Sequence, residues 1–244
     1  MTYTFPYYLI NQSQPSPVLD YVWDDTQGYL NHEHEYDASD LADKIGNVTI
    51  RAQTALCTGV YEWIVWRFHC LSDDPVAFQI AETAWWGNIR AAYIEECIEL
   101  DPTDYCGPVQ NPLGCAISYL AFLFDGTLSL RVALMYLSSL AMHVLPDTQP
   151  FENWLKTVTD RLLTFYLAPE DDPFEDIFND HEEERRGPLV AREVLDPSFD
   201  YHPDQAPMLL DQFLCNVDHA KNPFLHSPEE LIGAGIEHPY QILP

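Results

Sequence analysis

The stretch LGCAISYLAFLFDGTLSLRVALMYLSSLAMHVL, residues 113–145, is the most apolar part of the chain and indicates its fold class. The first half is too short to span a bilayer, Asp125 and Gly126 interrupt the run, and Arg131 would lie in hydrocarbon. We therefore interpret the stretch as two buried helices and not as a membrane hairpin. Because its second half is apolar on all sides, we expect that helix in the middle of a bundle.

Similar helical patterns occur before and after this stretch. They predict an all-α fold, a single-domain helical bundle of about five longer helices plus several short C-terminal helices. Asp74 followed by Pro75, for example, is a helix cap with proline at the first helical position. The longer helices are expected at 39 to about 71, 74 to about 100, 111–124, 127–145 and 149–167, and the shorter ones at 173–186, 188–195, 206–217 and 228–233.

The beginning of the chain differs from the rest. Residues 1–38 are rich in Tyr, Pro, Gln and Asn without helical periodicity, which predicts an extended N-terminal arm packed on the domain, with one short strand around Tyr3 to Ile10. Residues 39–244 are then the all-α helical domain. No basic residue precedes an apolar run near Met1, so we expect no secretory signal and a cytoplasmic location.

Negative charge dominates the composition. The 244 residues include 39 acidic and 11 basic ones, a formal net charge of -28, while 47% hydrophobic content is enough for a sizeable core. Such a surface repels phosphates and attracts basic proteins or cations. We therefore expect no direct binding of nucleic acid.

Several arginines lie inside otherwise apolar helical stretches. The guanidinium group can satisfy a carboxylate bidentately while its stem packs against apolar neighbours, so we expect internal ion pairs that involve Glu62 and Glu82. If these arginines are buried in ion pairs, the outer surface is more acidic than the total charge implies. These arginines are Arg51, Arg67, Arg90 and Arg131.

Aromatic and sulfur side chains are expected in the core. Trp63, Trp66, Trp85 and Trp86 occur at helical spacings, which is typical of packing positions, although one could be an exposed binding anchor. The six cysteines form no CxxC pair, and we interpret them as buried free thiols.

The segment EDDPFEDIFNDHEEERRGP, residues 170–188, holds nine carboxylates before its first arginine. Asp172 is a good N-cap, Pro173 fits the first helical position, and two arginines precede Gly187, so the segment is predicted to be a short helix. One face is apolar and the other acidic. As candidate partner-binding residues we take Asp171, Asp172, Asp176, Asp180, Glu182, Glu183 and Glu184. The alternative is a solvated helix face.

Signals for catalysis are weak. His32 and His34 would project from one side of an extended segment and could begin a metal site, but no further ligands with metal spacing are identifiable, and a polar exposed arm explains them equally. The chain has no nucleophile elbow and no glycine-rich phosphate loop. We expect neither an enzyme nor a cofactor.

The acidic all-α character and the ending NPFLHSPEELIGAGIEHPYQIL, residues 222–243, resemble immunity proteins that bacteria make against secreted polymorphic toxins. That resemblance implies a protein that caps the catalytic domain of a cognate basic toxin, such as a nuclease or an ADP-ribosyltransferase. Two other hypotheses stay open. One is a DNA mimic that inhibits nucleic-acid-binding proteins, and the other is a metal-dependent hydrolase built from carboxylates with His32 and His34.

Overall fold

The protein is all-α, as predicted. The computed structural model describes residues 5–10, 16–24, 37–95, 101, 104–124, 126–169, 186–216 and 218–242. Its α-helices are α1 (Tyr7–Ile10), α2 (Ser39–Ile45), α3 (Ile50–Phe68), α4 (Pro75–Ile89), α5 (Gly107–Phe124), α6 (Leu130–Val144), α7 (Gln149–Phe165), α9 (Ala206–Asn216) and α10 (Pro228–Gly233). Within these ranges, no helix is both long and apolar enough to cross a membrane.

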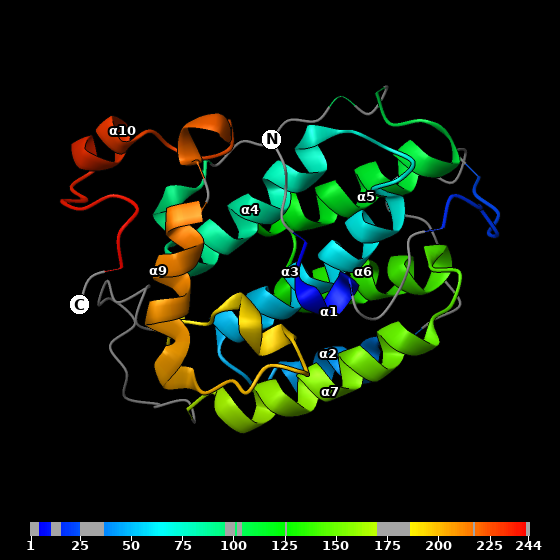
Figure 1. Cartoon of the computed structure of the whole chain (residues 1–244), viewed down its shortest axis with the longest axis horizontal. Coiled ribbons are helices and arrows are strands. Elements are labelled where there is room, and N and C mark those ends of the chain that lie inside the picture. The colour runs from blue at the N-terminus through cyan, green and yellow to red at the C-terminus, as the bar shows by residue number, and fades with distance from the viewer. Residues whose placement is uncertain are drawn as a thin grey trace.

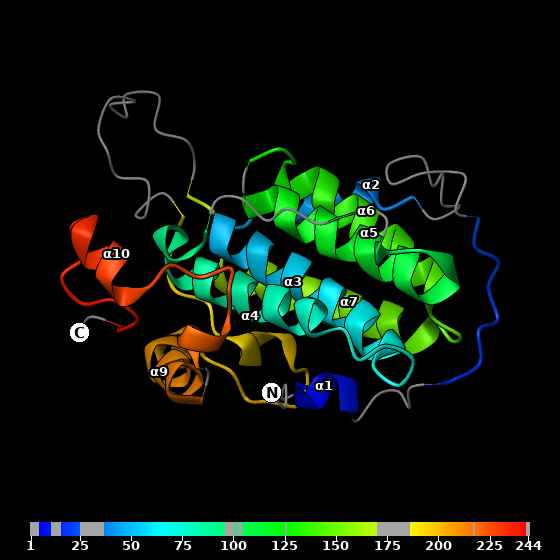
Figure 2. The ribbon, with the colours of Figure 1, turned by 90° about the horizontal axis from the view of Figure 1, so that it is seen from above.

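Helix α3, and not the helix that follows residue 127, occupies the middle of the bundle. It packs against α4, α5, α6 and α7 (Figures 1 and 2), and nearly all of its side chains are buried. The expectation that α6 would be central was wrong, because α6 turns one side outward and its Arg131 is exposed. Small residues explain the position of α3, since Ala52, Ala55 and Gly59 let neighbouring helices approach closely.

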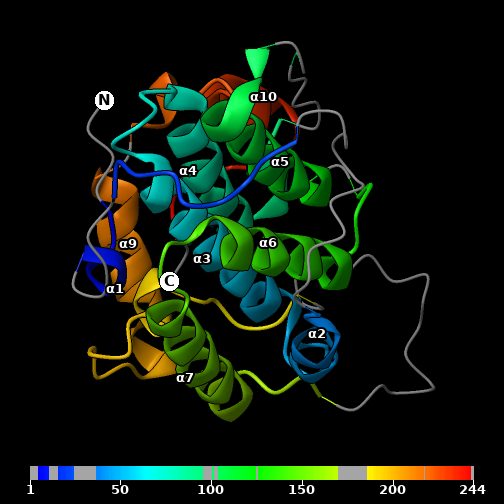
Figure 3. The same ribbon diagram turned by 90° about the vertical axis from the view of Figure 1, so that its right-hand side faces the viewer.

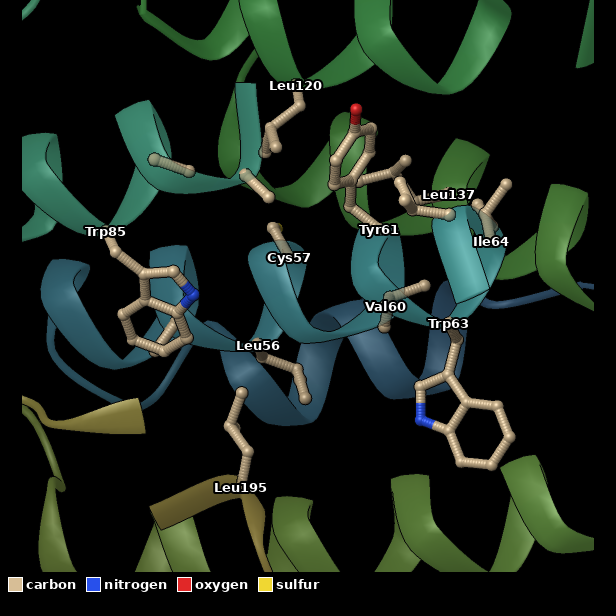
Figure 4. Packing of buried hydrophobic residues seen from close by; sticks show 14 of the residues in the cluster. Leu56, Cys57, Val60, Tyr61, Trp63, Ile64, Trp85, Leu120, Leu137 and Leu195 are labelled. Carbon is tan, nitrogen blue, oxygen red and sulfur yellow. The ribbon is translucent and has the colours of Figure 1, made fainter. Parts of the chain in front are cut away.

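Large aromatic side chains fill the space around α3 (Figure 4). Trp63 of α3 and Trp85 of α4 are 0% and 1% exposed, and Leu195 from the 3₁₀ turn Arg192–Leu195 closes the lower side. All four tryptophans named from the sequence are buried, which confirms them as core residues. The expectation of buried thiols was only partly right: Cys57 and Cys115 are buried, whereas Cys70, Cys106 and Cys215 are exposed. Cys97 lies outside the described residues.

The long helix expected from residue 39 to about 71 is two helices. Between α2 and α3, Val48 forms an antiparallel bridge with Leu167, Thr49 N donates to Tyr166 O at 2.9 Å, and Ala168 N donates to Asn47 O at 2.8 Å. These bonds to a segment far away in the sequence replace the helical ones, and therefore the chain turns there.

Other boundaries differ by a few residues. Helix α4 starts as predicted, with the Asp74 carboxylate accepting from Val76 N at 2.9 Å, but it ends at Ile89 because Arg90 is extended. In place of a strand around residues 3–10, Tyr7–Ile10 form a helical turn. The piece expected at 188–195 is only the 3₁₀ turn Arg192–Leu195, while α9 and α10 agree with their predictions. Of the helix predicted at 173–186, residues 173–185 lie outside the described residues, and Arg186 lies in a turn.

Helix α5 begins at Gly107, earlier than predicted, and contains Pro112. A proline has no N–H for the carbonyl four residues earlier, which here belongs to Pro108. The hydroxyl of Tyr21 donates to that carbonyl instead. A residue of the N-terminal segment thus satisfies the group that the internal proline leaves without a helical partner.

Replacing Gly59 by alanine should destabilise the protein. A Cβ atom there would lie 2.6 Å from Leu195 Cδ1 and 3.1 Å from two ring atoms of Trp154, so the core must shift, with a loss of about 1 to 3 kcal/mol in the free energy of unfolding. Urea denaturation measures it. Gly233→Ala is the matched control, because nothing lies within 4 Å of its Cβ position. Equal stabilities for the two variants would contradict the close packing of α3.

Candidate functional site

The buried arginines bond to backbone carbonyl oxygens at the ends of helices. Arg51 donates to Asn88 O at 2.9 Å and to Ile89 O at 3.1 Å, the last carbonyls of α4, and Arg67 donates to Val144 O at 2.9 Å, the last carbonyl of α6. Cations at a helix C-terminus are favoured by the helix dipole and satisfy carbonyls that have no helical partner.

Two further arginines act in the same manner. Arg186, 8% exposed, donates to Gly87 O at 2.7 Å in the last turn of α4. Arg161 of α7 holds the loop after Val194 through four carbonyl oxygens, among them Asp196 O at 2.6 Å. The sequence predicted that arginines lie inside, which is confirmed for Arg51 and Arg67. Both donate to backbone carbonyl oxygens, and Arg67 also lies 4.0 Å from the Asp20 carboxylate.

Arg131 and Arg90 do not follow the prediction of internal pairs. The side chain of Arg131 is 54% exposed and pairs with Asp43 of α2 at 2.8 Å, at the surface. Arg90 is half-buried at the end of α4. Arg131 lies in the first turn of α6, where its side chain reaches Asp43 of α2 at the surface.

This use of cations leaves the surface strongly acidic. Of the ten basic residues in the described ranges, four are exposed: Lys44, Arg131, Lys156 and Lys221. Two of these are already paired, Arg131 with Asp43 and Lys221 with Asp218 at 2.6 Å. The same ranges contain eighteen exposed carboxylates: those of Asp20, Asp24, Asp37, Asp40, Asp43, Asp73, Glu95, Asp101, Asp104, Asp147, Asp160, Asp200, Asp204, Asp211, Asp218, Glu229, Glu230 and Glu237.

One carboxylate lies at the centre of the core. Glu62 of α3 is 0% exposed, accepts a hydrogen bond from Tyr8 of α1 and another from Trp85 Nε1 at 2.9 Å, and pairs with Arg192 at 2.7 Å. The expectation of an arginine partner for Glu62 was right, although the partner is Arg192. This network ties both α1 and the 3₁₀ turn that starts at Arg192 to the central helices.

Glu82 of α4 is a second buried carboxylate in the same region. It is 7% exposed, and its Oε2 has no hydrogen-bond partner among the described residues. Burial raises the pKa of Glu82, and the nearby charge of Arg192 only partly opposes that effect. A carboxyl that is costly to ionise beside a paired one is common at catalytic centres, but also in structural networks.

A surface pocket of about 510 Å³ lies where α9 and the C-terminal segment meet α4. Trp86 lines it together with His219 and Tyr240, whose rings stack at 4.3 Å, and the amides of Asn216 and Gln241 contribute polar groups. Tyr240 has a φ of 58°, an uncommon backbone conformation for a residue other than glycine. The volume is in the range of small-ligand pockets.

The predicted acidic site is not part of the described structure. Asp171, Asp172, Asp176, Asp180, Glu182, Glu183 and Glu184 all lie outside the described residues, as do His32 and His34. Within the ranges that are described, no group of three or more His, Cys, Asp or Glu side chains could hold a metal ion.

Comparison with known proteins identified no similar chain: no family model matches, and neither a curated protein nor a solved structure shows significant similarity.

The raised pKa of Glu82 predicts a pH-dependent effect of Glu82→Gln. The raised pKa means that the folded state binds the Glu82 proton more tightly than the unfolded state does. The free energy of unfolding therefore falls as the pH rises from the ordinary glutamate pKa through the raised pKa. Glutamine stays neutral, so the variant should gain in free energy of unfolding relative to the natural protein between about pH 5 and about pH 8. Urea denaturation at both pH values tests this. If the two proteins differ in free energy of unfolding by the same amount at both pH values, Glu82 ionises as easily in the folded as in the unfolded protein, which would contradict the prediction.

Proposed function

We propose that the protein is an acidic binding protein that neutralises a basic protein partner, and that this partner is the catalytic domain of a toxin. The observation that supports the proposal most directly is the division of charge among the described residues: eighteen exposed carboxylates stand against four exposed cations, of which Arg131 is the one arginine. A field of one sign accelerates the encounter with an oppositely charged protein.

The mode of inhibition follows from the same charge distribution. A nuclease or an ADP-ribosyltransferase needs a positive cleft for its phosphate-bearing substrate, and a negative surface of protein size would compete for that cleft. Long-range attraction would govern the rate of association, while apolar side chains in contact would govern the lifetime of the complex. The resemblance to immunity proteins points to the same class of partner.

Isolation of the tagged protein from its native organism tests the proposal. We expect one stoichiometric basic protein that is retained at about 50 mM salt and released at about 500 mM, because the Debye length shrinks severalfold over that range. The gene encoding it should adjoin the gene of this chain. A partner that is nucleic acid, or the absence of any stoichiometric basic partner, would overturn the proposal, and competition with DNA for several unrelated DNA-binding proteins would favour a DNA mimic.

Charge reversal in the acidic run provides a second test. With the partner in hand, changing Asp176, Asp180 and Glu183 to lysine should slow association about tenfold or more at low salt, because steering depends on local charge. Stopped-flow mixing measures this rate. The matched control is the reversal of three carboxylates elsewhere, Asp160, Asp200 and Asp204, which are exposed. Association rates equally slow for both triple variants would mean that total charge acts and not this segment.

A further inference from the structure

The surface pocket of about 510 Å³ lies at the end of α9, where the C-terminal segment passes α4. In Figures 1 and 2 this is the left end of the molecule, and in Figure 3 it is the end away from the viewer. No lysine or arginine is among the described residues that line the pocket, whereas Asp218 contributes a carboxylate. An anion such as a phosphate is therefore unfavourable there, and the negative charge of the surrounding surface favours a cation.

The walls of the pocket are held in place by the core. Tyr240 N donates to the Tyr93 hydroxyl at 3.2 Å, and the Tyr240 hydroxyl donates to His226 O. The Tyr240 ring packs edge-on against the Trp86 ring with the ring centres 4.7 Å apart, and Trp86 is only 1% exposed. A ligand would therefore meet a preformed surface, which keeps the entropic cost of binding low.

Part of that surface is aromatic. The rings of His219 and Tyr240 stack with their centres 4.3 Å apart, and both side chains are half-buried, so part of the ring pair stays accessible. Aromatic rings attract cations, and a guanidinium, which is planar and weakly hydrated, stacks on them better than an ammonium does. Leu214, Pro228 and Pro239 supply apolar contacts for the stem of a long side chain.

The polar side of the pocket offers hydrogen-bond acceptors. Leu214, Cys215 and Asn216 form the last turn of α9, and among the described residues no hydrogen bond reaches their carbonyl oxygens. Carbonyls at a helix C-terminus carry the negative end of the helix dipole. From this end the chain continues to Asp218 and His219, which also line the pocket. A cation is therefore favoured at this end of α9.

Asp218 is not the main acceptor, because its Oδ2 already pairs with Lys221 Nζ at 2.6 Å. The side-chain oxygens of Asn216 and Gln241 lie at the pocket as further acceptors. Exposed carboxylates on the neighbouring turns attract a cation from a distance: those of Asp211, Glu229 and Glu237.

A metal ion is the alternative cation. Cys215, Asp218 and His219 carry atoms that can ligate metals, but no group of three such side chains in the described part of the chain could hold an ion. A pocket of about 510 Å³ also exceeds a coordination sphere with bonds of about 2 Å. The volume is suited instead to a long side chain with part of its backbone.

We propose that this pocket binds a guanidinium group, and that it receives an arginine side chain of the basic partner. The guanidinium would stack on the ring pair of His219 and Tyr240 and donate to the last carbonyl oxygens of α9 and to the side-chain oxygens of Asn216 and Gln241. An arginine buried in a pocket is a frequent anchor of protein–protein interfaces. The second half of the proposal rests on the proposed function, since it specifies which group of the basic partner is bound.

Three small probes test the inference on the intact protein: the amides of N-acetyl-arginine, N-acetyl-citrulline and N-acetyl-lysine. Citrulline has the shape of arginine without its charge, and lysine has the charge without the planar group. In nuclear magnetic resonance titrations, the arginine probe should shift the backbone amides of Asn216, His219 and Gln241 saturably, and the other two should bind about fivefold or more weakly. A citrulline or lysine probe that binds as tightly as the arginine probe, or no shift at these amides, would overturn the proposal.

A matched pair of variants locates the site. Asn216→Lys and Gln212→Lys add the same charge at exposed positions of α9; Asn216 lines the pocket, whereas Gln212 is not among its lining residues. We expect Asn216→Lys to weaken binding of the arginine probe about fivefold or more relative to Gln212→Lys, because a lysine at the pocket repels the guanidinium. Equal weakening would mean that overall charge, and not this pocket, attracts the probe, and would contradict the proposal.

The native partner separates the two proposals. We expect it to bind Asn216→Lys about fivefold or more weakly than Gln212→Lys. If it binds in a salt-sensitive manner but with equal affinity to both variants, the pocket does not receive its arginine, and the proposed function stands. If the arginine probe binds in the pocket but no basic partner exists in the native organism, the proposed function is wrong.

Discussion

The structure depends on arginine side chains that donate to the last carbonyl oxygens of helices. At Arg51 and Arg67 a guanidinium is buried, and its cost of desolvation is offset by several charge-assisted hydrogen bonds and by the negative end of a helix dipole. Carbonyls carry no net charge, so these bonds neutralise none of the carboxylates. The described part of a chain with a net charge of -28 thus uses most of its arginines for folding and leaves most of its carboxylates exposed, while Glu62 and Glu82 are buried.

Arg67 also connects the core to the N-terminal segment at residues 16–24. Its guanidinium joins the end of α6, through Val144 O, to the carbonyls of Ser16 and Val18. The same side chain therefore binds the end of a core helix and holds the N-terminal segment at Ser16 and Val18.

Local signals in the sequence predicted the helices whose ends are locally determined, while features that depend on distant partners were missed. The Asp74 cap and the capping box of Ser227 and Glu230 set the starts of α4 and α10 within a few residues. The break between α2 and α3 was missed because it is made by bonds to residues 166–168. Burial of arginines followed from their apolar surroundings, but their carbonyl partners follow only from tertiary packing. The predicted acidic site at 171–184 stays a prediction.

The most direct test of the account is to measure how fast each arginine is modified by an arginine-specific dicarbonyl reagent, followed by mass spectrometry of the native and the urea-unfolded protein. The account predicts that Arg131, whose side chain is 54% exposed, reacts in the native state, whereas Arg51, Arg67 and Arg186, at 7%, 2% and 8% exposure, react only after unfolding. Modification of Arg51 or Arg67 in the native protein at the rate of Arg131 would contradict it.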